Sequence, residues 1–340
     1  MRPLVATVDL SAICHNYILA KRCAPQRQAF AVVKANAYGH GAREVVTALH
    51  DEADGFAVAC LEEAAEVRAL HADARILLLE GCFEASEYAL AGQLRLDLVI
   101  QGLEQGEAFL AAGLDTPLNV WLKLDSGMHR LGFDPAALRA WHARLRNHPG
   151  VRELNLISHF ACADERNHPL TEQQVECFLG LLDLDFDQRS LANSAAVLTI
   201  PAAHMDWLRP GIMLYGATPF ADLSAAELGL KPAMSLTARL ISVREVAAGE
   251  SVGYGAGWVT PDSDRHGQLR LRRRLPAQRA SRHPGAGRRA THAVGRPGID
   301  GHADGRSRRP AGRPRRRSGG AMGRATGGGR GGACLRQHRL

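Results

Sequence analysis

The chain of 340 residues is long enough for one large domain or two ordinary ones, and its apolar fraction of 46% can build a sizeable core. Its net charge of +7 is divided unevenly: residues 265–340 hold 21 arginines, no lysine and two acidic residues, whereas residues 1–264 sum to −12. No apolar run reaches about 18 residues and the N-terminus lacks the pattern of a secretory signal, so neither a transmembrane helix nor export is expected.

Strand-like and helix-like segments alternate over residues 1–232. Ser11 can cap a first helix that places Ile13, Tyr17, Ile18 and Ala20 on one face. Eight strands are expected, at Phe30–Lys34, Gly55–Cys60, Ile76–Glu80, Asp97–Ile100, Asn119–Asp125, Leu154–Ser158, Ser190–Asn193 and around Trp207. Apolar strands that alternate with helices predict a parallel sheet covered on both faces, and eight such units fit a (β/α)8 TIM-like barrel. A doubly wound open sheet is the alternative, although no GxGxxG sequence opens the first helix.

The pattern changes near Ala233. The stretch "MSLTARLISVREVAAGESVGYG" alternates apolar and polar residues and turns at Gly249, which predicts antiparallel strands with one wet face. We therefore expect the beginning of a β-rich second domain over residues 233–264. Residues 265–340 contain sixteen glycines, no aromatic residue and neither periodicity, so this tail is expected to be disordered.

The seven cysteines are scattered singly, and none forms a CxxC pair. An odd, unpatterned set in a chain without a signal predicts reduced thiols and a cytoplasmic location. No residue set is expected to bind a metal.

The stretch "AFAVVKANAYGHG", from Ala29 to Gly41, reads as a buried strand that ends on Lys34 and breaks into a glycine-containing loop. At the top face of a barrel, a partly desolvated lysine amine is a nucleophile toward aldehydes. The alternative is a lysine that simply reaches solvent from a strand end.

This stretch closely resembles the cofactor-lysine motif of fold-type III pyridoxal-phosphate enzymes, and of alanine racemases in particular. Further segments resemble that family in the same order: "WLKLDSGMHRLGF", "ISHFACADE", "LANSAAVL", "DWLRPGIMLYG" and "VGYG". The resemblance covers about residues 3–260. It implies a homodimeric racemase that interconverts L-alanine and D-alanine with pyridoxal 5'-phosphate, for peptidoglycan synthesis or alanine catabolism.

The resemblance implies that Lys34 carries the cofactor as a Schiff base and also acts as a base. Tyr38 would hydrogen-bond the phosphate, and His159 would stack on the pyridine ring unless it is an ordinary strand-end histidine. Arg209 would face the ring nitrogen. Because arginine keeps its proton, the ring would be a weaker electron sink, which disfavours transamination.

The phosphate would be surrounded by Asn193, Ser194, Gly211 and Ile212, where glycine allows close backbone approach. Tyr215 is a further candidate phosphate neighbour, with core packing as the alternative.

The resemblance further implies that Arg130 binds the substrate carboxylate and the cofactor's phenolic oxygen. Lys123 would be carbamylated, its anion orienting the arginine; a plain charge pair between Lys123 and Asp125 is the alternative. Tyr254, delivered by the partner subunit, would be the second base. Its alternative role is that of a turn tyrosine between two glycines.

After Trp258 the chain departs from the family. Segments like "GYADGYPR" and "GRVSMDM" and a late tyrosine-bearing strand are absent. A second functional hypothesis is therefore a barrel that binds pyridoxal phosphate without turnover.

The arginine-rich tail has two interpretations. As a disordered arm it would bind nucleic acid through counterion release, which is the third functional hypothesis. The second interpretation is an out-of-frame product, in which the native sequence would end near residues 261–266. Codons for Arg270–Ala277 and for Val294–Asp304, when they are read one base later, can encode the two absent segments. An uninterrupted gene whose product has the expected intact mass would contradict the second interpretation.

Overall fold

The computed structural model describes residues 4–238, 242–260 and 267–271. Eight strands form one sheet in the order β8-β7-β6-β5-β4-β3-β2-β9, and all neighbouring pairs are parallel. Their bounds are β2 Gln28–Val32, β3 Gly55–Val58, β4 Ile76–Leu78, β5 Asp97–Ile100, β6 Leu118–Lys123, β7 Val151–Ile157, β8 Arg189–Ser190 and β9 Trp207–Leu208. A parallel bridge between Asn193 and Arg209 joins the β8 and β9 sides, so the sheet closes on itself. The expected barrel is thus confirmed, and the open-sheet alternative is wrong.

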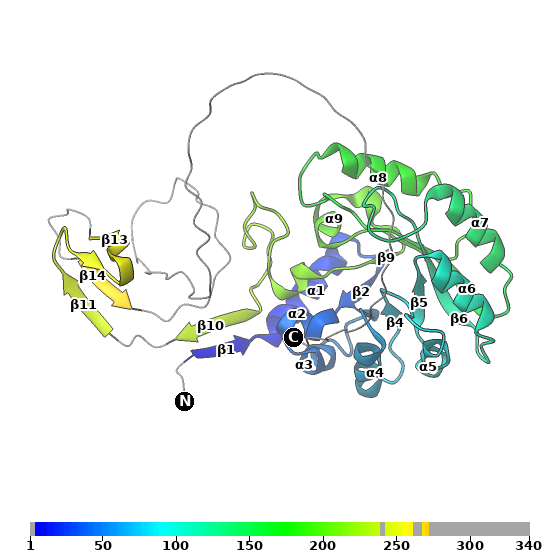
Figure 1. Ribbon diagram of the computed structural model, residues 1–340, viewed down its shortest axis with the longest axis horizontal. Helices are drawn as coiled ribbons and strands as arrows, with labels where there is room; N and C mark the ends of the chain where they lie inside the picture. Colours follow the sequence, from blue (N-terminus) through cyan, green and yellow to red (C-terminus); the bar gives the residue numbers. More distant parts are fainter. Residues whose placement is uncertain (1–3, 239–241, 261–266, 272–340) are drawn as a thin grey trace, which may run out of the picture. The chain divides into compact units, whose positions relative to one another are not determined.

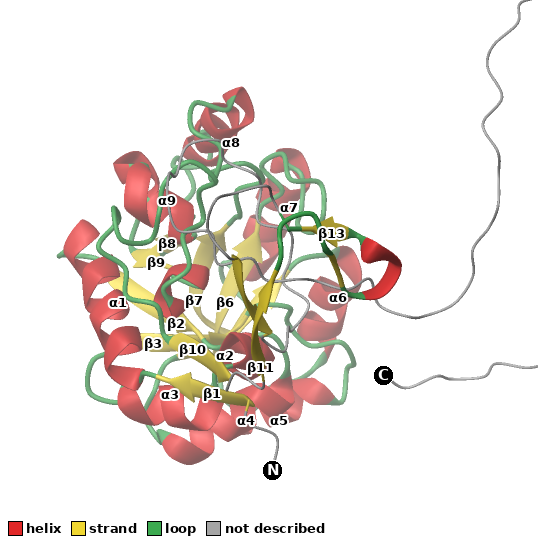
Figure 2. Ribbon diagram, turned by 90° about the vertical axis from the view of Figure 1, so that its left-hand side faces the viewer, coloured by secondary structure: helices red, strands yellow, loops and turns green. Residues whose placement is uncertain are grey.

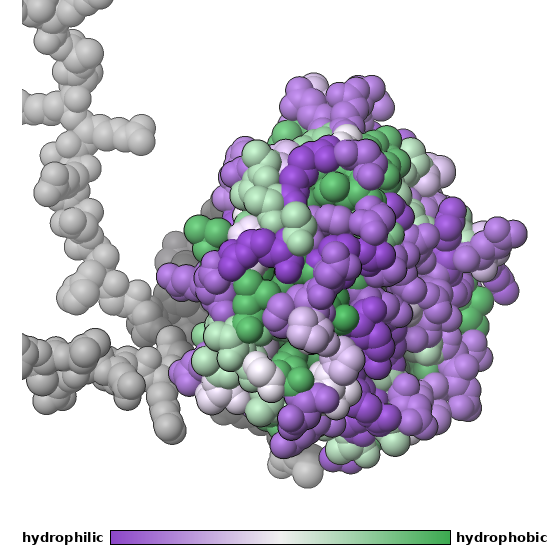
Figure 3. All heavy atoms as spheres, turned by 90° about the vertical axis from the view of Figure 1, so that its right-hand side faces the viewer, coloured by the Kyte–Doolittle hydropathy of each residue, from purple (hydrophilic) through white to green (hydrophobic). Residues whose placement is uncertain are grey.

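Helices surround the strands, as Figures 1 and 2 show. They are α1 Leu10–Cys23, α2 Lys34–Gly39, α3 Ala42–Ala48, α4 Leu61–Leu70, α5 Glu87–Gln93, α6 Leu103–Ala111, α7 Pro135–Leu145, α8 Pro169–Leu179 and α9 Ser194–Thr199, with short 3-10 turns at η1 Pro201–Ala203 and η2 Ile212–Tyr215. The face of the barrel in Figure 3 is mostly hydrophilic, with small separate hydrophobic areas, as expected of a face in contact with water. None of the described helices is long and apolar enough to cross a membrane.

Strand β2 shows how an apolar strand serves two layers at once. Ala29 and Ala31 belong to the cluster under the helices, whereas Phe30 and Val32 belong to the cluster inside the barrel. This alternation follows from the two-residue period of a strand. Inside the barrel, Phe30 stacks on Trp207 with ring centroids 3.9 Å apart. The interior is therefore packed by large side chains and forms a floor below the strand ends.

Some boundaries differ from the sequence prediction. Strand β2 ends at Val32, and Lys34 begins α2, a turn with left-handed backbone angles at Ala35 to Tyr38, instead of ending the strand. The first helix is capped by Asp9, whose Oδ1 accepts from Ala12 N at 3.2 Å, so the expected cap by Ser11 is wrong. Ser11 lies inside the first turn and donates to the same carboxylate. Asp9 serves because its extended backbone precedes the first helical residue.

Further strands lie outside the barrel. Strand β1 (Leu4–Val8), which was not predicted from the sequence, pairs antiparallel with β10 (Met234–Ala238). All five β10 side chains are exposed, so the prediction that only one face of this strand contacts water is wrong. Among the described residues, β10 pairs with β1 in a two-stranded sheet, which covers neither face.

The expected β-rich segment after residue 233 is present. It contains β11 Ser242–Val246, β12 Ser251–Val252, η3 Tyr254–Ala256 and β13 Trp258–Val259, followed by β14 Gly267–Leu271. One compact unit runs to Arg244, and a second begins at Glu245. The domain boundaries at 232 and 264 stay predictions. Most of the segment 265–340 lies outside the described residues. The predictions that this segment is disordered or is an out-of-frame product therefore concern residues that the structure does not describe.

Candidate active site

A cavity of about 610 Å³ lies beyond the carboxyl ends of the barrel strands. Its lining includes all ten barrel residues assigned from the sequence: Lys34, Tyr38, Lys123, Arg130, His159, Asn193, Ser194, Arg209, Gly211 and Ile212. In a barrel of parallel strands this face collects the side chains that follow each strand. The cavity size is that of a small-molecule site.

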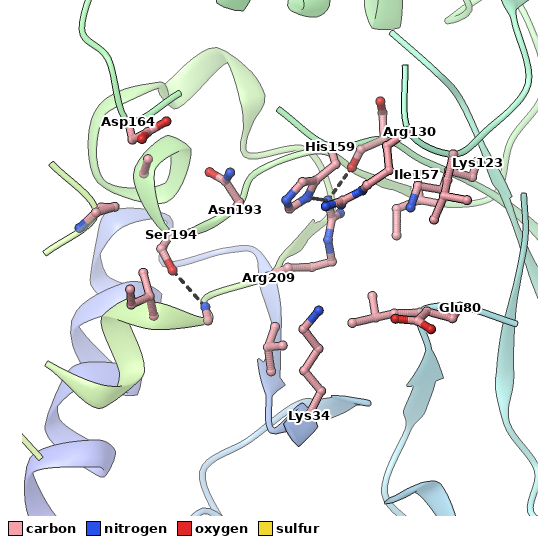
Figure 4. Close-up of a pocket in the computed structure, with 18 of the residues that line it drawn as sticks. Lys34, Glu80, Lys123, Arg130, Ile157, His159, Asp164, Asn193, Ser194 and Arg209 are labelled. Atoms are coloured by element: carbon pink, nitrogen blue, oxygen red, sulfur yellow. Dashed lines mark hydrogen bonds between the residues drawn. The ribbon is translucent and has the colours of Figure 1, made fainter. Parts of the chain in front are cut away.

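Lys34 follows β2, and Figure 4 shows its amine pointing toward the side of the pocket where Arg209 and His159 lie. The four residues after Lys34 turn the chain so that Tyr38 also lines the pocket. Tyr38 stacks on Tyr215 with ring centroids 4.8 Å apart, and burial raises the pKa of Tyr38. The Tyr215 hydroxyl donates to Val32 O at 2.8 Å from a buried position, which favours core packing over contact with a ligand.

One wall of the pocket is built where α9 and η2 both begin. Ser194 Oγ accepts from Gly211 N at 2.9 Å and from Met213 N at 3.3 Å, which ties the two segments together. A Cβ at Gly211 would lie 2.8 Å from the Tyr38 hydroxyl, so a larger residue would collide with it. Helix starts attract anions because their N–H groups point outward. This wall therefore suits an anionic group.

Arg209 is buried behind the pocket and held by several acceptors. Its guanidinium donates to Ser190 Oγ, to Ser158 O and, at 3.3 Å, to Leu191 O. Burial lowers the pKa of Arg209 to about 9, which is still above neutral pH. Arg209 is therefore a fixed cation that donates hydrogen bonds and keeps its proton.

His159 lies beside this cation, with its Nδ1 3.5 Å from Arg209 Nη2. Burial, together with the charge of Arg209, lowers the pKa of His159 to about 3. The imidazole is consequently neutral at physiological pH. A neutral flat ring at this position can stack on an aromatic ligand without adding charge.

Lys123 ends β6 inside the pocket. Burial lowers the pKa of Lys123 to about 8, and the charges of Arg209 and Arg130 act in the same direction. A substantial fraction of this amine is therefore neutral near pH 8, which is the form that reacts with carbon dioxide.

The carboxylate of Asp125 serves the loop that carries Arg130. Asp125 Oδ1 accepts from Gly127 N and from His129 N, each at 3.0 Å. Its Oδ2 lies 3.0 Å from His129 Nδ1. These contacts favour a loop-organising role for Asp125 over the charge pair with Lys123 that was the sequence alternative.

Two acidic residues of the lining, Glu80 and Asp164, were not assigned from the sequence. Glu80 could have been found, because it closes the apolar stretch Ile76–Glu80 just as Lys34 closes its own. The lining holds four cationic side chains against these two acids, so the pocket favours a ligand with negative charge.

Tyr254 belongs to the second compact unit, where it begins η3 and is 79% exposed. Its role as the second base stays a prediction.

The sequence model described as "Alanine racemase, N-terminal domain" matches residues 8–219, a range that includes every residue lining the pocket. The biosynthetic alanine racemase of Pseudomonas aeruginosa is 91% identical over 269 residues, which cover 79% of this chain and 75% of that protein. The chain belongs to the alanine racemase family. Within this family, the catabolic alanine racemase of Pseudomonas putida is 49% identical over 80% of this chain and 76% of its own length.

Solved structures of alanine racemases are similar to the fold of this chain. The crystal structure of the biosynthetic enzyme from Pseudomonas aeruginosa matches with a TM-score of 0.75 at 90% identity, over 79% of this chain and 75% of that one. The alanine racemase from Acinetobacter baumannii matches with a TM-score of 0.70 at 39% identity, over 76% and 73% of the two chains.

Proposed function

We propose that the chain is an alanine racemase, an isomerase that interconverts L-alanine and D-alanine with pyridoxal 5'-phosphate. The observation that carries the proposal is the pocket itself, which joins a lysine amine, the starts of two short helical segments and a buried arginine at the top of a barrel. When bound, pyridoxal phosphate would withdraw electrons from the Cα–H bond of an amino acid.

The residues present fit this cofactor. Lys34 offers the amine for its aldehyde, and the wall of Asn193, Ser194, Gly211 and Ile212, with Tyr38 opposite Gly211, offers the site for its phosphate. A larger residue at position 211 would displace the Tyr38 hydroxyl, because a Cβ there would lie 2.8 Å from it. The net positive lining suits the phosphate charge. His159 would stack on the ring.

Arg209 favours racemisation over other reactions of amino acids. Because arginine keeps its proton, Arg209 would donate a hydrogen bond to the ring nitrogen of the bound cofactor without protonating it. The cofactor would then be a weaker electron sink, which would favour return of the Cα proton to carbon. An acid in this position would favour transamination.

The remaining roles concern the substrate. Arg130 would hold the alanine carboxylate, oriented by a carbamylated Lys123. Lys34 would take and return the Cα proton on one face, and Tyr254 of the partner subunit would do so on the other, which requires a homodimer.

We propose a biosynthetic role, supplying D-alanine for peptidoglycan in the cytoplasm. The relative at 91% identity is described as biosynthetic, whereas the catabolic relative from Pseudomonas putida is 49% identical. The six cysteines in the described residues are free, as suits a reducing compartment.

The test is to load the purified chain with pyridoxal phosphate and record its bound absorbance band together with D-alanine formation from L-alanine. Lys34→Ala should abolish both, whereas Lys231→Ala, which changes an exposed lysine, should change neither. A band that survives Lys34→Ala would contradict the assignment of Lys34. A Lys34-dependent band without turnover would favour the cofactor-binding barrel over the racemase.

The two-base proposal has its own test. Tyr254→Phe removes a hydroxyl on one face only, so exchange of the Cα hydrogen with deuterated water should slow more for one enantiomer of alanine than for the other. Equal slowing for both enantiomers would show that Tyr254 is not the base of one face.

A further inference from the structure

The turn that follows Lys34 has an unusual backbone. Ala35, Asn36, Ala37 and Tyr38 all have φ between 52° and 53°, in the left-handed region. Residues with a Cβ visit this region singly and seldom, and none of these four is a glycine. A run of four persists only where surrounding contacts specify it.

Glu63 of α4 makes the most direct of these contacts. Its Oε1 accepts from Ala35 N at 2.7 Å, and its Oε2 accepts from Ala59 N at 2.8 Å. Ala59 is the first residue after β3, which pairs with β2. One carboxylate therefore ties the chain leaving β2 to the chain leaving β3, at the residue next to Lys34.

The far end of the turn is held in other ways. Asn36 Oδ1 accepts from Ala42 N at 2.8 Å, which joins the turn to the start of α3. Ala37 is fully buried and donates its N–H to Val33 O at 2.8 Å. Among the described residues, Glu63 is the only side chain that accepts a hydrogen bond from the N–H of Ala35.

The turn sets two pocket residues at once. Lys34 stands at its beginning and Tyr38 at its end, and both line the pocket. The Tyr38 hydroxyl lies against Gly211 on the opposite wall. If Ala35 relaxed to a right-handed conformation, the chain would leave Lys34 in another direction and Tyr38 would lose this position.

We propose that Glu63 is a positioning residue for cofactor capture. By holding the N–H of Ala35 it keeps the left-handed turn that aims the Lys34 amine at the aldehyde of pyridoxal phosphate and Tyr38 at its phosphate. The inference rests on the proposed function. Glu63 does not line the pocket, so it acts through the turn and not by touching the cofactor.

The experiment compares Glu63→Ala and Glu63→Gln with Glu66→Gln, which changes an exposed glutamate of the same helix. Two quantities are measured on the apo full-length chain: the Kd for pyridoxal phosphate, and the rate at which borohydride traps the cofactor on Lys34 relative to Lys231, read by peptide mass spectrometry. Neither quantity requires racemase activity.

Glu63→Ala should raise the Kd by about 10-fold to 100-fold and lower the ratio of trapping at Lys34 to trapping at Lys231 by a similar factor, because hydrogen bonds to a charged acceptor are lost. For Glu63→Gln, the Kd and the trapping ratio should lie between those of Glu63→Ala and of wild type, because the single amide oxygen of glutamine can replace one of the two carboxylate acceptors. Glu66→Gln should match wild type.

The proposal would be overturned if Glu63→Ala lowered the melting temperature but left the Kd and the trapping ratio, both measured well below that temperature, unchanged. A contact that only stabilises the fold would give this result. If Glu63→Ala does not fold, the proposal is tested with Glu63→Gln and with Glu63→Asp, which shortens the side chain. The Kd for pyridoxal phosphate and the trapping ratio are measured for both. Wild type that shows no selective trapping at Lys34 would instead overturn the proposed function, and this inference with it.

Discussion

Three ionisable side chains of the pocket differ in charge because of burial and of the charges beside them. Arg209 stays cationic even though burial lowers its pKa to about 9. Beside it, burial and the same cation lower the pKa of His159 to about 3, so the imidazole is neutral. Lys123 lies between these extremes, with a pKa lowered to about 8. These charge states are those required by the proposed roles of Arg209 as a fixed hydrogen-bond donor, His159 as a stacking ring and Lys123 as a reactive amine.

Lys123 allows a prediction with a clear pH dependence. Its folded pKa of about 8 lies below the ordinary lysine value of 10.5, so the neutral amine is populated as pH rises through about 8. Carbamate formation requires that neutral amine. With ¹³C-bicarbonate, the protein's carbamate signal in NMR should therefore grow between about pH 7 and pH 9.

The Lys123→Ala variant supplies the control, because it should lose the part of the signal that comes from Lys123 and keep the part that comes from the α-amino group. A carbamate signal of unchanged size in Lys123→Ala, or a Lys123-dependent signal that appears only above about pH 10, would show that Lys123 is not the residue carbamylated between about pH 7 and pH 9.

At the scale of the elements, short connecting segments decide the geometry of the site. The segment after β2 is a left-handed turn, and the segments that begin α9 and η2 are tied through Ser194. The apolar strands were predictable because their composition and length allow little else. Their exact ends were not, since the turn that begins at Lys34 forms a hydrogen bond with Glu63, a residue 29 positions away from Lys34 in the sequence.

The left-handed turn predicts opposite effects for two chemically identical substitutions. Ala35 is exposed at a φ of 52°, so Ala35→Gly should raise the free energy of unfolding by about 0.5–1 kcal/mol, the relief of strain exceeding the added chain entropy.

The matched control is Ala140→Gly, which places glycine at an exposed position inside the right-handed helix α7. It should lower the free energy of unfolding by about 1 kcal/mol. Urea unfolding of both variants checks the signs. Destabilisation by Ala35→Gly comparable to that by Ala140→Gly would mean that the turn carries no strain at Ala35.

At the scale of the whole molecule, the chain joins an acidic segment to a strongly basic one. Residues 1–264 sum to −12, while the 21 arginines of residues 265–340 give that segment +19. Every residue that lines the pocket lies within 1–219. Cofactor binding and charge-driven binding should therefore be separable by deletion.

If the tail is translated as printed, the full chain should shift DNA in a gel without sequence preference. Its affinity should fall by at least about 1000-fold between about 50 and about 200 mM salt, because arginine contacts release counterions from phosphates. Deletion after Trp258 should abolish the shift and leave the Kd for pyridoxal phosphate unchanged. A shift that persists after the deletion would place nucleic-acid binding in the acidic part and contradict this division.

The sequence by itself determined a parallel sheet covered by helices, because eight apolar stretches between helix-like segments favour buried parallel strands, and it named the pocket residues through their resemblance to one family. It predicted a barrel with an open sheet as the alternative, and the bridge between Asn193 and Arg209 in the structure decided between them. It also located Lys34 at the end of the first such stretch. Only the tertiary structure decided that Asp9 caps the first helix, that Tyr215 packs in the core, and that Glu63 holds the turn after Lys34. These features depend on which side chain lies close enough to hydrogen-bond a given backbone group in the folded chain. Local composition does not predict that distance.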